Sequence, residues 1–206
     1  MTNQTDIAEE LLRIKAIQLR TNVDEFFTWT SGIKSPIYCD NRLTMSYPVV
    51  RKKIKQAFMK MIESLDQKPE VIAGCATAGI PHAAWIAEEL DLPMVYVRSS
   101  PKGHGKENQI EGIVAPGQKV LVIEDLISTG GSSIEMSQVL RDAEADVMEV
   151  FAIFTYGLHK AKTAFTEAEL NYQTITDFDQ LLEMLQQKQE ITEAETERLL
   201  YWRNQL

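Results

Sequence analysis

The sequence of 206 residues is long enough for one domain with a substantial hydrophobic core. Its apolar and charged fractions, 44% and 25%, are ordinary for a soluble globular protein, and its net charge of −9 argues against nucleic acid or an anionic membrane surface as a partner. No apolar run is long enough to span a bilayer and the first residues show no secretory signal, so we expect a cytoplasmic protein.

Two amphipathic helices are predicted in the first third of the chain. Ile7, Leu11 and Ile14 recur at helical spacing, and Thr5 or Asp6 would cap that helix. A second helix would start with a proline in its first turn, which is a favourable place for that residue. The proline is Pro48, and the apolar face of the helix consists of Val50, Ile54, Phe58, Met61, Ile62 and Leu65.

Four short apolar runs follow, separated by helical stretches: Val71–Ala73, Met94–Val97, Val120–Ile123 and Val150–Phe154. Strands that alternate with helices form a parallel sheet with helices on both faces. The sequence therefore predicts an α/β fold. The tail from Asp177 to Leu206 is rich in Glu and Gln and predicts two further short helices.

A long loop is predicted between the second and third runs. Residues from about 99 to 118 contain no core-length apolar run, but they carry Lys102 and His104 among several glycines. The loop follows a strand that ends at Arg98. Basic side chains in this position predict a mobile lid over phosphate groups, although the same loop taken alone would be read as merely exposed.

The segment from Val120 to Ser132 is the most informative part of the sequence. Four apolar residues, Val120 to Ile123, predict a buried strand. Two adjacent carboxylates and two further apolar residues follow it, and a hydroxyl- and glycine-rich turn then leads into a helix. The residues after the strand are Glu124, Asp125, Leu126, Ile127, Ser128, Thr129, Gly130, Gly131 and Ser132.

This order of residues predicts a phosphoribosyl pocket. A glycine turn at a helix N-terminus offers backbone N–H groups and a favourable field to a phosphate, and the hydroxyls of Ser128, Thr129 and Ser132 add donors. The two carboxylates are unsuited to phosphate but suit ribose hydroxyls or a cationic centre. The simpler alternative is that Ser132 and Glu135 form only a capping box. Neither the Walker pattern nor the dinucleotide glycine pattern is present.

The segment Val120–Ser132 resembles the diphosphate-sugar motif of type I phosphoribosyltransferases. Two further segments resemble the orotate phosphoribosyltransferase family in particular. Phe26–Arg42, which contains SGIKSPIY, is similar to the base-recognition segment, and Ala76–Pro81 is similar to the diphosphate-side loop. Arg98, Lys102 and His104 match the cationic residues of the mobile catalytic loop.

The resemblance implies a type I phosphoribosyltransferase fold in a single domain over 1–206, a twisted, mainly parallel sheet flanked by helices. A small hood would be formed by about 1–45 and part of the C-terminal tail, with the mobile loop at about 99–118. It also implies transfer of the 5-phosphoribosyl group from 5-phosphoribosyl-1-diphosphate to orotate in pyrimidine biosynthesis, with Mg²⁺, in a homodimer with shared active sites. The Mg²⁺ would be carried by the diphosphate substrate, with no metal site of the protein's own; Cys39 and Cys75 offer no metal spacing.

The same resemblance assigns roles to residues. Lys102, Glu124 and Asp125 would be catalytic, with the two carboxylates on the ribose hydroxyls. Leu126 to Ser132 would wrap the 5′-phosphate, and Arg98, Lys102 and His104 would bind the diphosphate. Ser128 and Lys34 would contact orotate.

The chain departs from the family pattern at four positions. Thr30, Ala78 and Ser99 stand where some members have lysine. Tyr156 stands where some members have an arginine that binds the orotate carboxylate, so Lys34, Ser128 or backbone amides would bear more of that recognition. The tryptophans, among them Trp29, are expected in the core or at an interface.

Two other functions remain open at the level of the sequence. The first is a phosphoribosyltransferase for a purine or another pyrimidine, which the strand-loop motif alone cannot distinguish. The second is a nucleic-acid-binding regulator that senses the phosphoribosyl compound; it would need a basic face, which the acidic balance disfavours.

Overall fold

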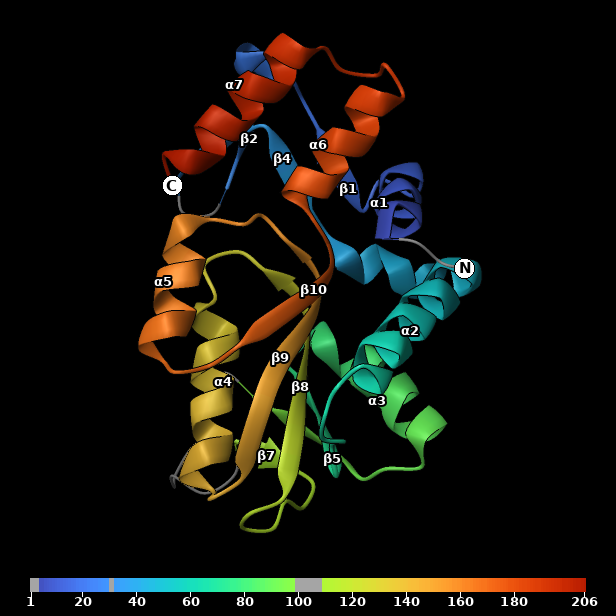
Figure 1. The fold of residues 1–206 in the computed structure, drawn as a ribbon, viewed down its shortest axis with the longest axis vertical. Coiled ribbons are helices and arrows are strands. Elements are labelled where there is room, and N and C mark those ends of the chain that lie inside the picture. The colour runs from blue at the N-terminus through green and yellow to red at the C-terminus, as the bar shows by residue number, and fades with distance from the viewer. Residues whose placement is uncertain (1–3, 30–31, 99–108) are drawn as a thin grey trace.

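The computed structural model describes residues 4–29, 32–98 and 109–206, and it arranges them as a twisted sheet with helices on both faces below a smaller hood (Figure 1). The six-stranded sheet has the order β10-β9-β8-β5-β6-β7, in which each neighbouring pair is parallel except β6 and β7. Its strands are β5 (Val71–Cys75), β6 (Met94–Val97), β7 (Ile110–Glu111), β8 (Lys119–Ile127), β9 (Asp146–Thr155) and β10 (Tyr172–Asp177).

Helices cover the two faces of this sheet. One face carries α1 (Gln4–Arg13), α2 (Pro48–Glu63), α3 (Gly79–Leu90) and α6 (Phe178–Gln187), and the other carries α4 (Gly131–Asp142) and α5 (His159–Glu167). Alternate side chains of β8 enter the two cores, because successive residues of a strand point to opposite faces: Leu121 and Ile123 toward the first, Val120 and Val122 toward the second.

The hood comprises two small antiparallel sheets together with α6 and helix α7 (Glu193–Asn204), at the upper end of Figure 1. Strand β1 (Ile17–Leu19) pairs with β4 (Ile37–Cys39), and β2 (Phe27–Thr28) pairs with β3 (Lys34–Ser35). Short 3₁₀ helices η1 (Val23–Glu25) and η2 (Asn41–Ser46) connect these strands to their neighbours. The indole nitrogen of Trp202 in α7 donates a hydrogen bond to the carbonyl oxygen of Lys34, 2.9 Å away, and so ties the tail to the β2–β3 hairpin.

The structure confirms the α/β fold and all four predicted strands, and it adds β7 and β10 to their sheet. The segment YQTITD of β10 was not predicted because it lacks an apolar run, and it lies at the edge of the sheet. The two predicted tail helices are α6 and α7. The predicted cap at Thr5 or Asp6 is wrong, because α1 is already formed at Gln4 and Asp6 lies within its first turn.

The loop predicted over about 99–118 is described only from residue 109 onward, where β7 pairs with β6. Lys102 and His104 lie outside the described residues. Among the residues that are described, no helix has the length and apolar character to cross a membrane.

Candidate functional site at the end of the central strand

The predicted strand, loop and helix lie next to each other in the middle of the sheet. Strand β8 runs to Ile127, beyond the predicted end, because Leu126 and Ile127 pair with Phe154 and Thr155 of β9. Glu124 and Asp125 therefore lie within the strand, close to its carboxyl end. In a parallel sheet, ligands bind outside this end of the strands.

The loop after β8 presents backbone donors. Gly130 has φ +82°, a left-handed conformation that favours glycine, and a Cβ atom there would meet the ring of Phe165. Helix α4 begins at Gly131 without a side-chain cap, so the capping box between Ser132 and Glu135, the simpler alternative to a phosphate loop, does not form. The first N–H groups of α4 consequently have no acceptor within the helix, which suits an anion.

Glu124 is the more deeply buried of the two carboxylates, with 6% of its surface exposed. It accepts hydrogen bonds from the backbone N–H of Asp125, at 3.0 Å, and from the hydroxyl of Ser133, at 3.2 Å, and it contacts the thiol of Cys75. Burial and then the neighbouring charge of Asp125 raise the pKa of Glu124 to about 8. Burial also raises the pKa of Asp125. Because burial removes water from both carboxyl groups, they would gain from hydrogen bonds with the hydroxyl groups of a ligand.

Two contacts of this pair were not predicted from the sequence. The first is the hydroxyl of Ser133, in the first turn of α4, which donates to Glu124. Asn41 of η2 donates a hydrogen bond from Nδ2 to the carbonyl oxygen of Asp125, at 2.7 Å. That contact joins residues 84 positions apart, so no local signal in the sequence could have indicated it.

The loop similar to the diphosphate-side loop connects β5 to α3, beside β8. Gly79 opens α3 directly against the backbone of β8, where an added Cβ would overlap the carbonyl oxygen of Ile123. The loop from Ala76 onward therefore approaches the carboxylate pair. On the far side of β5, Arg98 follows the end of β6 and forms an ion pair with Glu111 of β7, with Nη1 and Oε1 3.2 Å apart.

A cavity of about 690 Å³ lies between the phosphate loop and the hood. Its walls come from β2, the end of β8, the start of α5 and the end of the chain. They are Thr28, Trp29, Ile33, Tyr38, Leu126, Ser128, Thr129, Tyr156, Leu158, Lys160, Gln205 and Leu206.

The cavity has an aromatic wall that the sequence did not predict. Trp29 stacks on Tyr156 with ring centroids 4.9 Å apart and an interplanar angle of 29°, and its indole nitrogen donates to the carbonyl oxygen of Ile37. Trp29 is thus partly buried, as expected, but it also faces the cavity. Predicted residue Ser128 lines the same space. Lys34 lies on β3, with its ammonium group 2.8 Å from the hydroxyl of Thr28.

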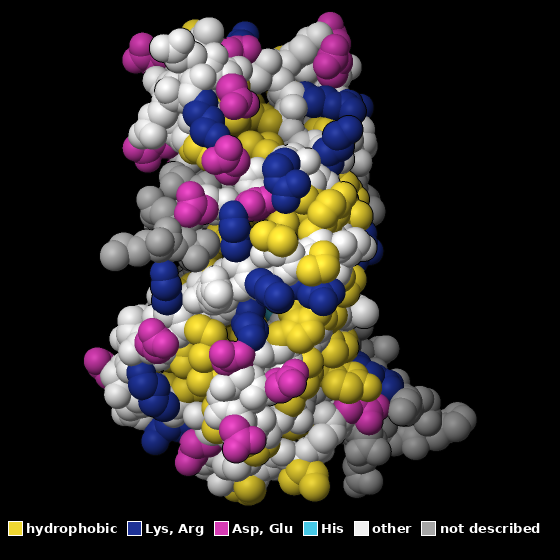
Figure 2. All heavy atoms as spheres, turned by 90° about the vertical axis from the view of Figure 1, so that its right-hand side faces the viewer, with side chains coloured by type: hydrophobic (Ala, Val, Ile, Leu, Met, Phe, Trp, Pro, Cys, Tyr) yellow, Lys and Arg dark blue, Asp and Glu magenta, His cyan; other side chains and the backbone are white. Residues whose placement is uncertain are grey.

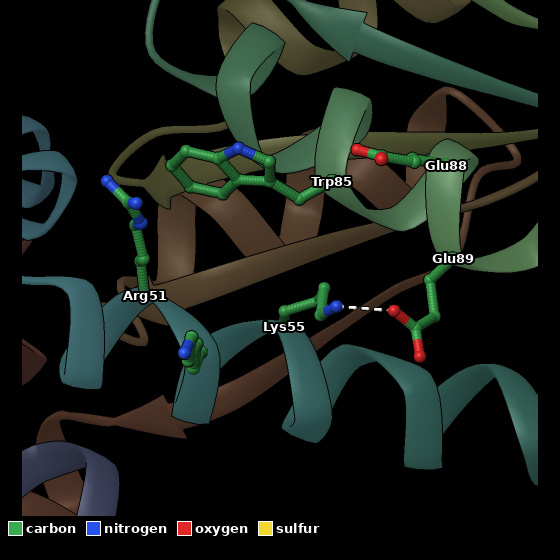
Figure 3. A pocket seen from close by; sticks show the side chains of 6 residues that line it. Arg51, Lys55, Trp85, Glu88 and Glu89 are labelled. Carbon is green, nitrogen blue, oxygen red and sulfur yellow. Dashed lines mark hydrogen bonds and ion pairs between the residues drawn. The ribbon is translucent and has the colours of Figure 1, made fainter.

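A second cavity of about 440 Å³ lies between α2 and α3 (Figure 3). Arg51 sits over the ring of Trp85, 5.4 Å from its centroid, and Lys55 pairs with Glu89. This cavity shares none of its lining residues with the first, and none of the predicted site residues lines it. It belongs to the outer surface of the helices.

Known proteins resemble the chain in sequence and in fold. A family model described as phosphoribosyl transferase domain matches residues 46–179. The orotate phosphoribosyltransferase of Oceanobacillus iheyensis is 60% identical over 97% of this chain and 98% of its own length, and that of Fusobacterium nucleatum is 54% identical over 98% and 95%. The crystal structure of orotate phosphoribosyltransferase from Aeropyrum pernix matches 87% of this chain and 97% of its own, with a TM-score of 0.76 and 27% identity.

Proposed function

The chain belongs to the orotate phosphoribosyltransferase family, and on that basis we propose that the protein transfers the 5-phosphoribosyl group from 5-phosphoribosyl-1-diphosphate to orotate. A bond forms between N1 of orotate and C1 of the ribose, while the bond from C1 to the diphosphate oxygen breaks and N1 loses its proton. The products are orotidine 5′-monophosphate and diphosphate. The observation that carries this proposal is the cavity of about 690 Å³, which joins the phosphate loop to an aromatic wall beneath the hood.

The 5′-phosphate would be bound by the loop that opens α4. The uncapped N–H groups after Gly130, with the hydroxyls of Ser128, Thr129 and Ser132, supply donors, and the helix dipole favours the negative charge. Leu126 and Ile127 hold the loop in place through their pairing with β9.

Glu124 and Asp125 would bind the ribose hydroxyls. Loss of diphosphate leaves positive charge on the ribose ring, and fixed carboxylates beside that ring stabilise it more than they stabilise the uncharged ground state. The raised pKa of each carboxyl shows that burial penalises its charge, and this penalty is offset as the ring becomes cationic. The negative charge of orotate lies on its carboxylate, so N1 also gives up its proton as the new bond forms, and solvent or the departing diphosphate would accept it.

The cationic residues would stabilise the leaving diphosphate. By the family resemblance these are Arg98, Lys102 and His104, of which the last two lie outside the described residues. Arg98 already pairs with Glu111, so diphosphate would share its guanidinium with that carboxylate. Closure of the loop over the substrates would exclude water and protect the reactive sugar from hydrolysis.

We also propose that Mg²⁺ takes part in the reaction, bound to the diphosphate of the substrate. In the described ranges, no cluster of three or more His, Cys, Asp or Glu side chains could hold a metal ion. The ion would be carried by the diphosphate and would take most of its oxygen ligands from substrate and water, which is how Mg²⁺ is usually bound. When bound, it would neutralise charge that develops on the leaving oxygens.

We further propose that the protein is a homodimer and that it acts in the cytoplasm. Four large apolar side chains are exposed along η2 and the start of α2: Leu43, Met45, Tyr47 and Val49. Figure 2 shows apolar and basic side chains gathered on this side of the molecule. Asn41 of the same segment contacts Asp125, so a second copy seated here would adjoin the ribose site. Val49→Asp should shift the mass measured by light scattering from dimer toward monomer, and an unchanged mass would exclude this face.

Orotate absorbance measured with time tests the proposed activity. Purified protein should consume orotate only when 5-phosphoribosyl-1-diphosphate and Mg²⁺ are both present, with adenine, hypoxanthine, xanthine and uracil as control bases. Reaction with another base alone would keep the phosphate site and reject orotate. Binding of the sugar without turnover of any base would instead favour the sensing regulator.

A further inference from the structure

The cavity of about 690 Å³ between the phosphate loop and the hood has one charged side chain on its wall, and no role has yet been assigned to it. Of the lining residues, all in the described part of the chain, Lys160 is the one of a basic or acidic side-chain type. Lys160 lies in the first turn of α5, directly after the uncapped start of that helix at Leu158. Figure 1 shows α5 just below the end of α7, and the residues that follow α7, Gln205 and Leu206, also line the cavity.

Two other candidates for binding an anion at the cavity are already engaged. Tyr156 is 3% exposed, stacks on Trp29 and forms a hydrogen bond between its hydroxyl and the backbone of Cys39. It therefore holds the hood on the sheet and carries no positive charge. The ammonium group of Lys34 is bound to the hydroxyl of Thr28, and Lys34 does not line the cavity.

Lys160 has no such engagement. Within residues 4–29, 32–98 and 109–206, its ammonium group forms no ion pair and no hydrogen bond. Its neighbours on the cavity wall are neutral hydroxyl, aromatic, aliphatic and amide side chains. In a protein of net charge −9, the exposed and unpaired cation of Lys160 at the edge of this cavity marks where an anionic group of a ligand would be favoured.

We infer that Lys160 binds the carboxylate of orotate and thereby selects an anionic pyrimidine over a neutral one. This inference rests on the proposed function. The planar ring would lie against Trp29 and Tyr156, an arrangement that aromatic walls favour. The carboxylate would point to Lys160, and the ribose and phosphate would extend toward Ser128 and Thr129.

The strength of this contact sets the expected effect. A hydrogen bond to a charged group contributes enough to change an affinity by about 10- to 100-fold. Lys160→Met removes the charge but keeps an unbranched apolar stem. Its kcat/KM for orotate should fall by about that factor, chiefly through KM, because the carboxylate keeps its charge through the reaction.

Binding of two products gives a readout that does not depend on turnover. Orotidine 5′-monophosphate carries the carboxylate and uridine 5′-monophosphate lacks it. Calorimetry should show that Lys160→Met weakens binding of the first by about 10- to 100-fold and of the second by less than about threefold. Lys160→Arg should retain part of the preference.

Lys162→Met is the matched control, because it removes the same charge from the same helix. Lys162 lines a different groove, beside Phe165 and Tyr172. Both products should bind this variant as they bind the wild type. Lys34→Met tests the alternative anchor.

The outcomes separate the inference from the proposed function. An active wild type whose preference for orotidine 5′-monophosphate survives in Lys160→Met overturns the inference alone. The same holds if Lys34→Met abolishes the preference instead. A wild type that neither consumes orotate nor prefers its nucleotide overturns the proposed function itself.

Discussion

Gly79 allows helix α3 to lie against the backbone of strand β8, next to the carboxylate pair, and the change Gly79→Ala probes that contact. A Cβ atom added here would overlap the carbonyl oxygen of Ile123, and it would lie 3.2 Å from the carbonyl carbon of Ile123 and 3.3 Å from Cα of Glu124. All three atoms belong to the backbone of a buried central strand. No side chain can rotate away to relieve the overlap.

The size of the effect follows from these contacts. Carbon atoms pack best at about 3.5–4.0 Å, so α3 must move from β8 by roughly 1 Å. Overpacking of a core costs about 1–3 kcal/mol, and a clash with backbone on a central strand belongs at the upper end, about 3 kcal/mol. For a chain of this size the melting temperature should fall by about 6–12 °C. Displacement of Glu124 by a similar distance should lower kcat by about 10- to 100-fold.

Calorimetric melting and orotate turnover measure the two effects. Gly131→Ala is the control for stability, because a Cβ atom at Gly131 meets no atom within 4 Å and its melting temperature should stay close to that of the wild type. If Gly79→Ala melts within about 2 °C of the wild type and turns over at a similar rate, the contact between α3 and β8 does not hold the site as argued.

Three further changes test individual side chains. Asp125→Asn should keep the fold, measured by circular dichroism, and lower kcat by about 10²-fold or more, because the stabilising charge beside the ribose is lost; near-normal turnover would contradict its role. The pKa of Glu124 is raised from 4.5 to about 8, so the stability linked to its proton is full below pH 4.5 and is lost as the pH rises through 8. The melting temperature of the ligand-free wild type should therefore fall more steeply over that window than that of Glu124→Gln, and parallel curves would refute the assignment. Tyr156→Phe removes the hydroxyl that bonds to the backbone of Cys39 and should lower the free energy of unfolding by about 1 kcal/mol in a urea titration, with kcat/KM for orotate changed by less than about threefold; a large loss of orotate affinity would make Tyr156 the anchor.

The sequence predicted the parts of the fold that have a local signal. The apolar runs gave β5, β6, β8 and β9, and the order of carboxylates, hydroxyls and glycines located the loop before α4. The end of β8 was placed too early, because pairing of Leu126 and Ile127 with β9 depends on a partner strand that a local pattern does not contain. Strand β10 was missed for a related reason: its polar side chains are tolerated at a sheet edge.

The base end of the site could not be predicted in the same way. Trp29 and Tyr156 are far apart in the chain and meet only because the hood folds onto the sheet. No sequence pattern distinguishes Lys160 from other lysines of polar helices. The cavity that it lines is formed by four segments that are separate in the sequence. Lys102 and His104 lie outside the described residues, so their predicted roles stay predictions.

The hydrogen bond from Trp202 to the carbonyl oxygen of Lys34 bears on the order in which the molecule is assembled. It joins positions 168 residues apart, and contacts of such long range form late because the chain between them must first be ordered. Ribosomal synthesis would thus complete the sheet and the phosphate loop before α7 emerges to support the β2–β3 hairpin. A nascent chain at that stage would hold the sugar-phosphate half of the pocket while the half for the base is still unfinished.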